Sequence, residues 1–129
     1  MPTALITGAS SGIGYELANI FAEKGNNLVL VARSESKLQV LKESLEALYG
    51  VSVVTIIKDL TEPGAVDYIF QTTEAKDIIV DYLINNAGFG DYGVFHTNEW
   101  QKEKAMIDLN ITALTYLTKL YLKKMVSRD

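Results

Sequence analysis

The stretch ALITGASSGIGYELA, residues 4–18, constrains the fold of this chain more than any other. A short apolar run, typical of a buried strand, leads into three closely spaced glycines, and a helical pattern begins directly after them. A helix that starts in such a bend offers unpaired N–H groups, and glycine lets the backbone approach an anion. The stretch therefore predicts a phosphate-binding turn. A tight turn that needs glycine for its geometry alone is the alternative.

The rest of the chain alternates apolar runs with helical patterns. The runs predict strands at residues 3–7, 27–32, 51–57 and 81–85. Between them we expect one helix from Gly12 to a stop at Gly25, a second from its cap at Ser34 to a stop at Gly50, and a third that opens at Thr61 to Pro63. Strands that alternate with helices form βαβ units, so the pattern predicts an α/β fold with one doubly wound parallel sheet.

The last part of the chain carries one long helical pattern, from Asn98 to about Met125, with a kinked helix as an alternative to a straight one. Trp100, near its start, is expected to be a packing anchor. The residues predicted to share its apolar face are Ile107, Ile111, Leu114, Thr118, Tyr121 and Met125. In the segment before this helix, Phe89, Tyr92 and Phe95 are candidates for a substrate wall, with packing under a loop as the alternative. His96 is expected at the surface.

Charge and composition narrow the class of protein. The net charge of −4, without a cluster of lysine and arginine, argues against a nucleic-acid partner. Because the chain has no cysteine, disulfides and thiolate metal sites are excluded, and we predict no metal site. The N-terminus lacks the pattern of a signal peptide, and no apolar segment approaches the roughly 18 residues of a membrane helix. We expect one soluble, cytoplasmic domain over residues 1–129.

Four motifs, taken together, resemble those of the short-chain dehydrogenase/reductase family. TGASSGIG at residues 7–14 resembles the family's cofactor signature T-G-x-x-x-G-x-G. DL at 59–60 and NNAG at 85–88 follow in the family's order, and Asn110 in LNITA matches the asparagine of its catalytic tetrad. The resemblance runs the full length of the chain. It implies a Rossmann-like fold, truncated after the fourth strand and the helices that follow it, and hydride transfer between a carbonyl and an alcohol.

The resemblance also implies which residues hold the cofactor. These are Thr7, Gly8, Ser10, Ser11, Gly12, Ile13, Gly14, Arg33, Ser34, Asp59, Leu60, Asn86, Ala87 and Gly88. Asp59 can accept a hydrogen bond from the adenine amino group, although an aspartate after a strand is often a turn cap. Asparagine has a low helix propensity, so Asn110 in mid-helix favours a functional role; a harmless surface asparagine is the alternative.

The end of the second strand indicates which nicotinamide cofactor is bound. Family members that prefer NAD usually carry an acid there, which binds the adenine ribose. Here Ala32 is followed by Arg33 and Ser34. Because an arginine can pair bidentately with a 2′-phosphate, the sequence favours NADP over NAD. An exposed arginine at a helix entry is the alternative.

The family's catalytic Tyr-x-x-x-Lys pair is missing, since none of the seven tyrosines has a lysine four residues on. The chain thus resembles the N-terminal, cofactor-binding part of a reductase of small carbonyl or alcohol substrates. A nucleotide-binding module without catalysis is the alternative, while the glycine spacing disfavours a methyltransferase. We expect an open sheet edge at 81–85, an exposed stripe of Ile111, Leu114, Thr118 and Tyr121, and therefore a homodimer through the 98–125 helices.

Overall fold

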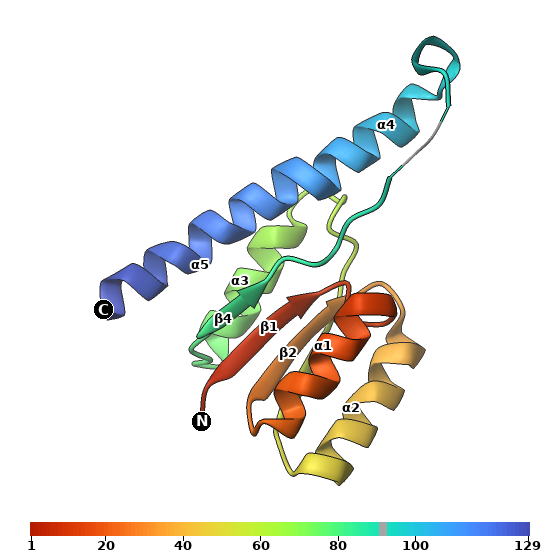
Figure 1. Cartoon of the computed structure of the whole chain (residues 1–129). Helices are drawn as coiled ribbons and strands as arrows, with labels where there is room; N and C mark the ends of the chain where they lie inside the picture. The colour runs from red at the N-terminus through yellow and green to blue at the C-terminus, as the bar shows by residue number, and fades with distance from the viewer. Residues whose placement is uncertain (91–92) are drawn as a thin grey trace.

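The computed structural model describes residues 1–90 and 93–129 (Figure 1). Four parallel strands form one sheet in the order β3-β2-β1-β4, as predicted for a doubly wound fold. The strands are β1 (Thr3–Thr7), β2 (Asn27–Ala32), β3 (Val53–Ile57) and β4 (Tyr82–Ile84). The α-helices are α1 (Gly12–Glu23), α2 (Glu35–Tyr49), α3 (Ala65–Ala75), α4 (Trp100–Ile107) and α5 (Leu114–Arg128). A 3-10 turn, η1 (Phe95–Thr97), precedes α4, and a π-helical segment, η2 (Asp108–Ala113), joins α4 to α5.

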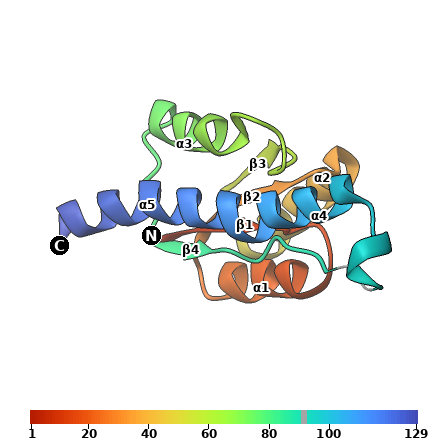
Figure 2. The ribbon, with the colours of Figure 1, turned by 90° about the horizontal axis from the view of Figure 1, so that it is seen from above.

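Helices cover both faces of the sheet (Figure 2). On β2, Leu28 and Leu30 belong to the core under α1 and α2, whereas Val29 and Val31 belong to the core under α3 and α5. None of the four is more than 1% exposed. Burial on both faces explains why the sequence of β2 is an uninterrupted apolar run.

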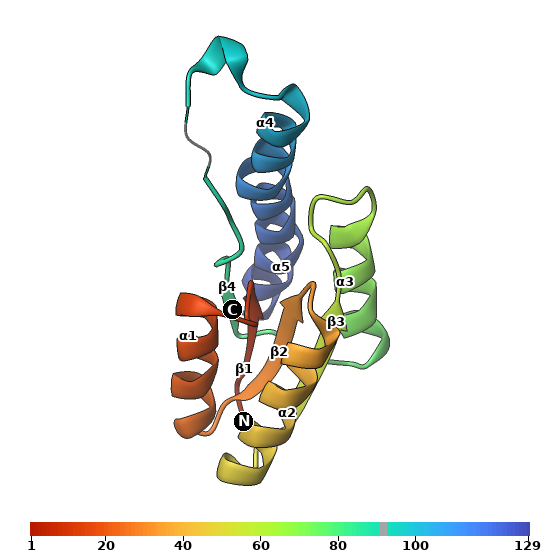
Figure 3. The ribbon, with the colours of Figure 1, turned by 90° about the vertical axis from the view of Figure 1, so that its right-hand side faces the viewer.

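The carboxyl ends of the strands meet at one edge of the sheet. Thr7 of β1 is in register with Val31 of β2, and Ala32 of β2 with Ile57 of β3. Helix α4 and the segment before it project beyond this edge (Figure 3). The segments that follow all four strands therefore converge there, as expected for the ligand-binding edge of an open α/β sheet.

Helix α3 and strand β3 begin at least two residues later than predicted. Helix α3 starts at Ala65 rather than at Thr61 to Pro63, because Gly64 adopts a left-handed conformation with φ of +80° and closes a turn before the helix. Strand β3 starts at Val53 rather than at residue 51, because the Ser52 N–H donates to the Asn27 side chain. Both differences come from local turn geometry, which a pattern of apolar residues does not encode.

The predicted long helix over residues 98–125 is observed as α4, η2 and α5, which follow one another without a break (Figure 1). A π-helical turn thus lies where the pattern allowed a kink. A π turn holds more residues than an α turn, so the faces before and after it are offset. The predicted apolar face splits accordingly. Tyr121 is buried together with Ala113 and Leu117, whereas Ile107 and Ile111 are 40% and 58% exposed. The expectation of an exposed Tyr121 is wrong.

The start of α4 differs from the prediction too. Trp100 is 60% exposed and anchors no core, because α4 projects beyond the sheet. His96 is exposed in η1, as predicted. Among the helices in residues 1–90 and 93–129, none combines the length and apolarity needed to cross a membrane.

Candidate functional site

A cleft of about 660 Å³ lies at the carboxyl edge of the sheet. Predicted site residues from the ends of all four strands line it: Gly8, Ser10, Ser11, Arg33, Asp59, Leu60, Asn86, Ala87 and Gly88. The other predicted cofactor residues, Thr7, Gly12, Ile13, Gly14 and Ser34, are not among its lining. Thr7 and Gly14 contact residues that line the cleft, whereas Ile13 is 72% exposed on the first turn of α1.

Thr7 connects the ends of β1 and β4. Its Oγ1 accepts hydrogen bonds from the backbone N–H groups of Asn86 and Ala87, both at 3.0 Å, and donates to the Ile84 carbonyl at 3.4 Å. The side chain is almost fully buried. This one hydroxyl thus forms hydrogen bonds with backbone groups at and just beyond the end of β4. It thereby holds the segment after β4 next to the glycine bend.

The glycine bend packs tightly against α1. A Cβ on Gly14 would collide with the Gly8 carbonyl oxygen and would lie 2.5 Å from Asn86 Nδ2. That amide donates to the same carbonyl at 3.2 Å. Gly12 differs, because its φ is +57° while the space around a Cβ would be open. Gly14 therefore permits close packing, and Gly12 permits the left-handed turn.

The first turn of α1 is open to an anion. Its N-cap, Ser11, is extended, its side chain makes no capping hydrogen bond, and the turn holds no acidic residue. By contrast, the N-cap of α2, Ser34, accepts from the Lys37 N–H at 3.3 Å. Unpaired N–H groups and the helix dipole attract negative charge. The bend with its glycines thus fits the diphosphate of a dinucleotide.

Asp59 closes a turn at the end of β3. Its Oδ1 accepts from the Thr61 N–H at 2.9 Å and from the Thr61 hydroxyl at 2.7 Å. Burial acts to raise the pKa of the Asp59 carboxyl, but these hydrogen bonds and the nearby Arg33 charge together hold that pKa below its usual value. Asp59 Oδ1 thus caps a turn, which was the alternative to adenine binding. Contact of Asp59 with an adenine remains a prediction.

Positive charge dominates the cleft. Arg33, Lys58 and Lys102 line it, against the single carboxylate of Asp59. Over residues 1–90 and 93–129, neither of the two ion pairs involves these cations. The Lys58 ammonium instead lies 4.5 Å from the centroid of the Tyr68 ring. A cleft with more cations than carboxylates, in a chain of net charge −4, fits an anionic ligand.

Sequence reasoning missed three of the residues that line the cleft from α4 and η2. These are Lys102, Ala105 and Leu109. Their spacing of three and four residues places them on one helix face, and this spacing can be recognised in the sequence. The sequence did not indicate that this face would turn toward the cleft. Lys58 was missed as well, although it directly precedes Asp59.

Asn110 lies in η2 and holds the outer wall of the cleft. Its Nδ2 donates to the Phe89 carbonyl at 2.7 Å, and its Oδ1 accepts from the Phe89 N–H at 3.1 Å. A Cβ on Gly88 would lie 2.8 Å from that Oδ1, so only glycine fits there without displacement. Asn110 itself does not line the cleft, but Phe89 does.

The candidates for a substrate wall have separate positions. Phe89 lines the cleft, whereas Phe95 is 81% exposed and does not pack under a loop. Tyr92 lies outside the residues that the structure describes. Asn85 ties the end of β4 to α5, because its Nδ2 donates to Thr118 Oγ1 at 2.9 Å. In the described part of the chain, no group of three or more acidic or histidine side chains is arranged to hold a metal ion.

Comparison with known proteins gives one consistent family. A family model described as short chain dehydrogenase matches residues 2–129. The chain is 30% identical over 125 residues to a 7beta-hydroxysteroid dehydrogenase of Collinsella aerofaciens, covering 97% of this chain and 47% of that protein. It thus spans about half the length of this relative.

Solved structures agree with this result. A short-chain dehydrogenase from Sphingobium yanoikuyae in complex with NADPH has a TM-score of 0.93 at 39% identity, covering 99% of this chain and 50% of that one. L-sorbose reductase from Gluconobacter frateurii, complexed with NADPH and L-sorbose, has a TM-score of 0.92 at 32% identity, covering 98% of this chain and 48% of that one.

Proposed function

Because the chain belongs to the short-chain dehydrogenase family, we propose that it is the cofactor-binding part of an NADP-dependent oxidoreductase that interconverts a carbonyl and an alcohol. The observation that carries the choice of NADP is Arg33, which lines the cleft directly after the neutral Ala32 and is in neither ion pair of the described residues. The two NADPH complexes among the similar structures support it.

Each part of the cleft has a role in this proposal. The glycine bend and the first turn of α1, including Ile13, hold the diphosphate. Arg33 and Ser34 bind the 2′-phosphate, while Asp59 and Leu60 contact the adenine. The segment Asn86–Gly88 borders the ribose next to the nicotinamide. When bound, NADP(H) supplies the hydride chemistry. Asn110, the proposed catalytic asparagine, also positions this wall through its two hydrogen bonds with Phe89.

Turnover needs groups that this sequence lacks. Because no tyrosine is followed four residues later by lysine, we expect the 129-residue chain to bind cofactor without reducing a substrate. The relatives named above act on a hydroxysteroid and on sorbose, so they support only the class of small carbonyl or alcohol substrates. A nucleotide-binding module without catalysis is the second candidate. A Tyr-x-x-x-Lys pair in the sequence that follows residue 129 in the parent gene would decide for the enzyme.

We further propose a homo-oligomer in a reducing cytoplasm. The exposed apolar residues Ile107, Ile111 and Leu114 along α4 to α5 favour a second copy of the chain as partner. The absence of cysteine suits a reducing compartment.

Calorimetric titration with NADP and NAD tests the proposal. We expect NADP to bind more tightly, and Arg33→Ala to lower NADP affinity about ten- to a hundredfold while NAD affinity stays the same. Arg33→Lys keeps the charge but loses the bidentate geometry, so its NADP affinity should lie between those of the wild type and Arg33→Ala. Equal affinities in the wild type, or an Arg33→Ala variant that binds NADP normally, would refute the assignment.

A further inference from the structure

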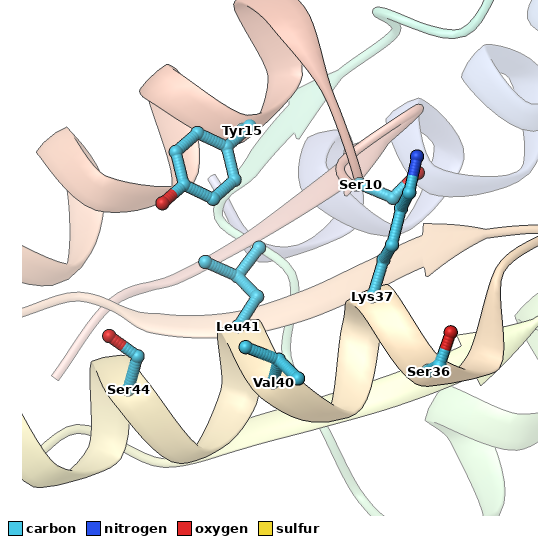
Figure 4. Close-up of a pocket in the computed structure, with 7 residues that line it drawn as sticks. All are labelled: Ser10, Tyr15, Ser36, Lys37, Val40, Leu41 and Ser44. Carbon is cyan, nitrogen blue, oxygen red and sulfur yellow. The ribbon is translucent and has the colours of Figure 1, made fainter.

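A second, smaller groove of about 350 Å³ lies between α1 and α2 (Figure 4). Ser10, Ser36 and Lys37 form its polar part, while Val40 and Leu41 contribute apolar side chains. The Lys37 side chain extends from α2 toward the bend that carries Ser10 (Figure 4). Tyr15 and Ser44 line the other end, so the groove has one positively charged end, at Lys37.

That polar end adjoins the cofactor cleft. Ser10 lines both spaces, with Arg33 lining the cleft and Lys37 lining the groove. The hydroxyls of Ser34 and Ser36 lie 3.4 Å apart, so a short chain of hydroxyls connects the end of β2 to the groove. An anion bound beside Ser10 would therefore lie where the space lined by Arg33 adjoins the space lined by Lys37.

Lys37 is available to such an anion. Within residues 1–90 and 93–129, no carboxylate lies within ion-pair distance of its ammonium. Glu35, the acid in the first turn of α2, lines neither space. The backbone N–H of Lys37 donates to Ser34, and this hydrogen bond does not depend on the lysine side chain.

We propose that Lys37 is a second residue that selects NADP, by pairing with the 2′-phosphate from the groove that adjoins the cleft lined by Arg33. The inference rests on the proposed function and deepens it. A phosphate monoester carries close to two negative charges at neutral pH, so one guanidinium leaves part of that charge unpaired. Arg33 supplies a flat fork and Lys37 a point charge, while the hydroxyls of Ser10 and Ser34 donate to the remaining oxygens.

NADP and NAD differ only in this phosphate, so the pair of ligands isolates its contribution. We expect Lys37→Ala to lower NADP affinity about tenfold and to leave NAD affinity unchanged. Lys37→Arg should restore most of the loss. Lys42→Ala removes the same charge from the same helix but lines neither space, so it should bind both cofactors as the wild type does. The NADP affinity of Lys37→Ala should also depend less on salt concentration.

Each other outcome overturns a definite statement. If Arg33→Ala loses the preference for NADP and Lys37→Ala keeps it, Lys37 is not a phosphate ligand, while the proposed function stands. If Lys37→Ala weakens both cofactors equally, its effect does not come from the 2′-phosphate and the inference is wrong. If the wild type binds the two cofactors equally, both proposals fail together.

Discussion

Asn110 binds both backbone groups of Phe89, donating to its carbonyl at 2.7 Å and accepting from its N–H at 3.1 Å. The two residues belong to different elements, since Asn110 lies in the π-helical η2 and Phe89 in the segment after β4. The contact therefore fixes the long α4–α5 unit against the wall of the cleft. It also explains why a residue of low helix propensity is acceptable in mid-helix.

Replacing this amide should loosen the wall of the cleft. We expect Asn110→Leu to lower the free energy of unfolding by about 1–2 kcal/mol through the loss of two hydrogen bonds. Hydrogen exchange of the Phe89 amide should become faster. Asn110→Asp keeps the acceptor but places a carboxylate beside the Phe89 carbonyl, so it should protect that amide only in part. Unchanged exchange in Asn110→Leu would show that the contact is unimportant in solution.

Thr7 offers a test of the junction between β1 and β4. Thr7→Val preserves the shape of the side chain but leaves the N–H groups of Asn86 and Ala87 without their acceptor. We expect a loss of about 2–3 kcal/mol in the free energy of unfolding, measured with urea. Thr7→Ser retains the hydroxyl and should cost only about 1 kcal/mol. Equal losses in the two variants would assign the effect to packing instead.

Substitution of alanine for Gly12 and for Gly14 should have different effects on stability. In Gly14→Ala the new methyl group collides with the Gly8 carbonyl, so we expect a loss of about 3 kcal/mol or more, together with weaker NADP binding. In Gly12→Ala the methyl group has open space, and only the backbone strain at φ of +57° remains, about 1–2 kcal/mol. Urea unfolding of both variants measures the difference, and the reverse ranking would contradict the packing of the bend.

The sequence predicted the elements and the motifs well because both are local. The continuous apolar sequence of β2 indicates by itself that the strand is buried, and the glycines of the bend indicate by themselves a tight turn. The sequence did not predict the π segment η2, nor the contact that its Asn110 makes with Phe89, 21 residues away. Trp100 was misjudged for a related reason, because only the packed structure shows that α4 extends past the sheet.

Burial of Tyr121 predicts a dependence of stability on alkaline pH. Burial raises the pKa of the Tyr121 hydroxyl to about 12, despite the opposing effect of its hydrogen bond with Thr73 Oγ1 at 2.7 Å. Above a pH of about 10 the unfolded chain loses this proton and the folded chain keeps it, so stability falls until a pH of about 12. Tyr121→Phe should cost about 1 kcal/mol at neutral pH.

The difference in stability between the wild type and Tyr121→Phe isolates this residue from the other tyrosines. It should be constant below a pH of about 10, shrink as the pH rises above 10, and change sign before a pH of about 12. Urea unfolding at a series of pH values measures it. A difference that does not change over this range would mean that Tyr121 ionises equally in both states.

The exposed apolar residues of α4 to α5 predict self-association. Ile107 ends α4, Ile111 lies in η2 and Leu114 begins α5, and they are 40%, 58% and 37% exposed. If two copies pair through these residues, a charge at Ile111 must be buried without a partner. Ile111→Lys should then raise the dimer dissociation constant about tenfold or more. Gln101→Lys adds the same charge at an exposed position near the start of α4 and should leave the assembly unchanged. Light scattering over a dilution series distinguishes the two variants, and a wild type that is monomeric at every concentration would refute the dimer.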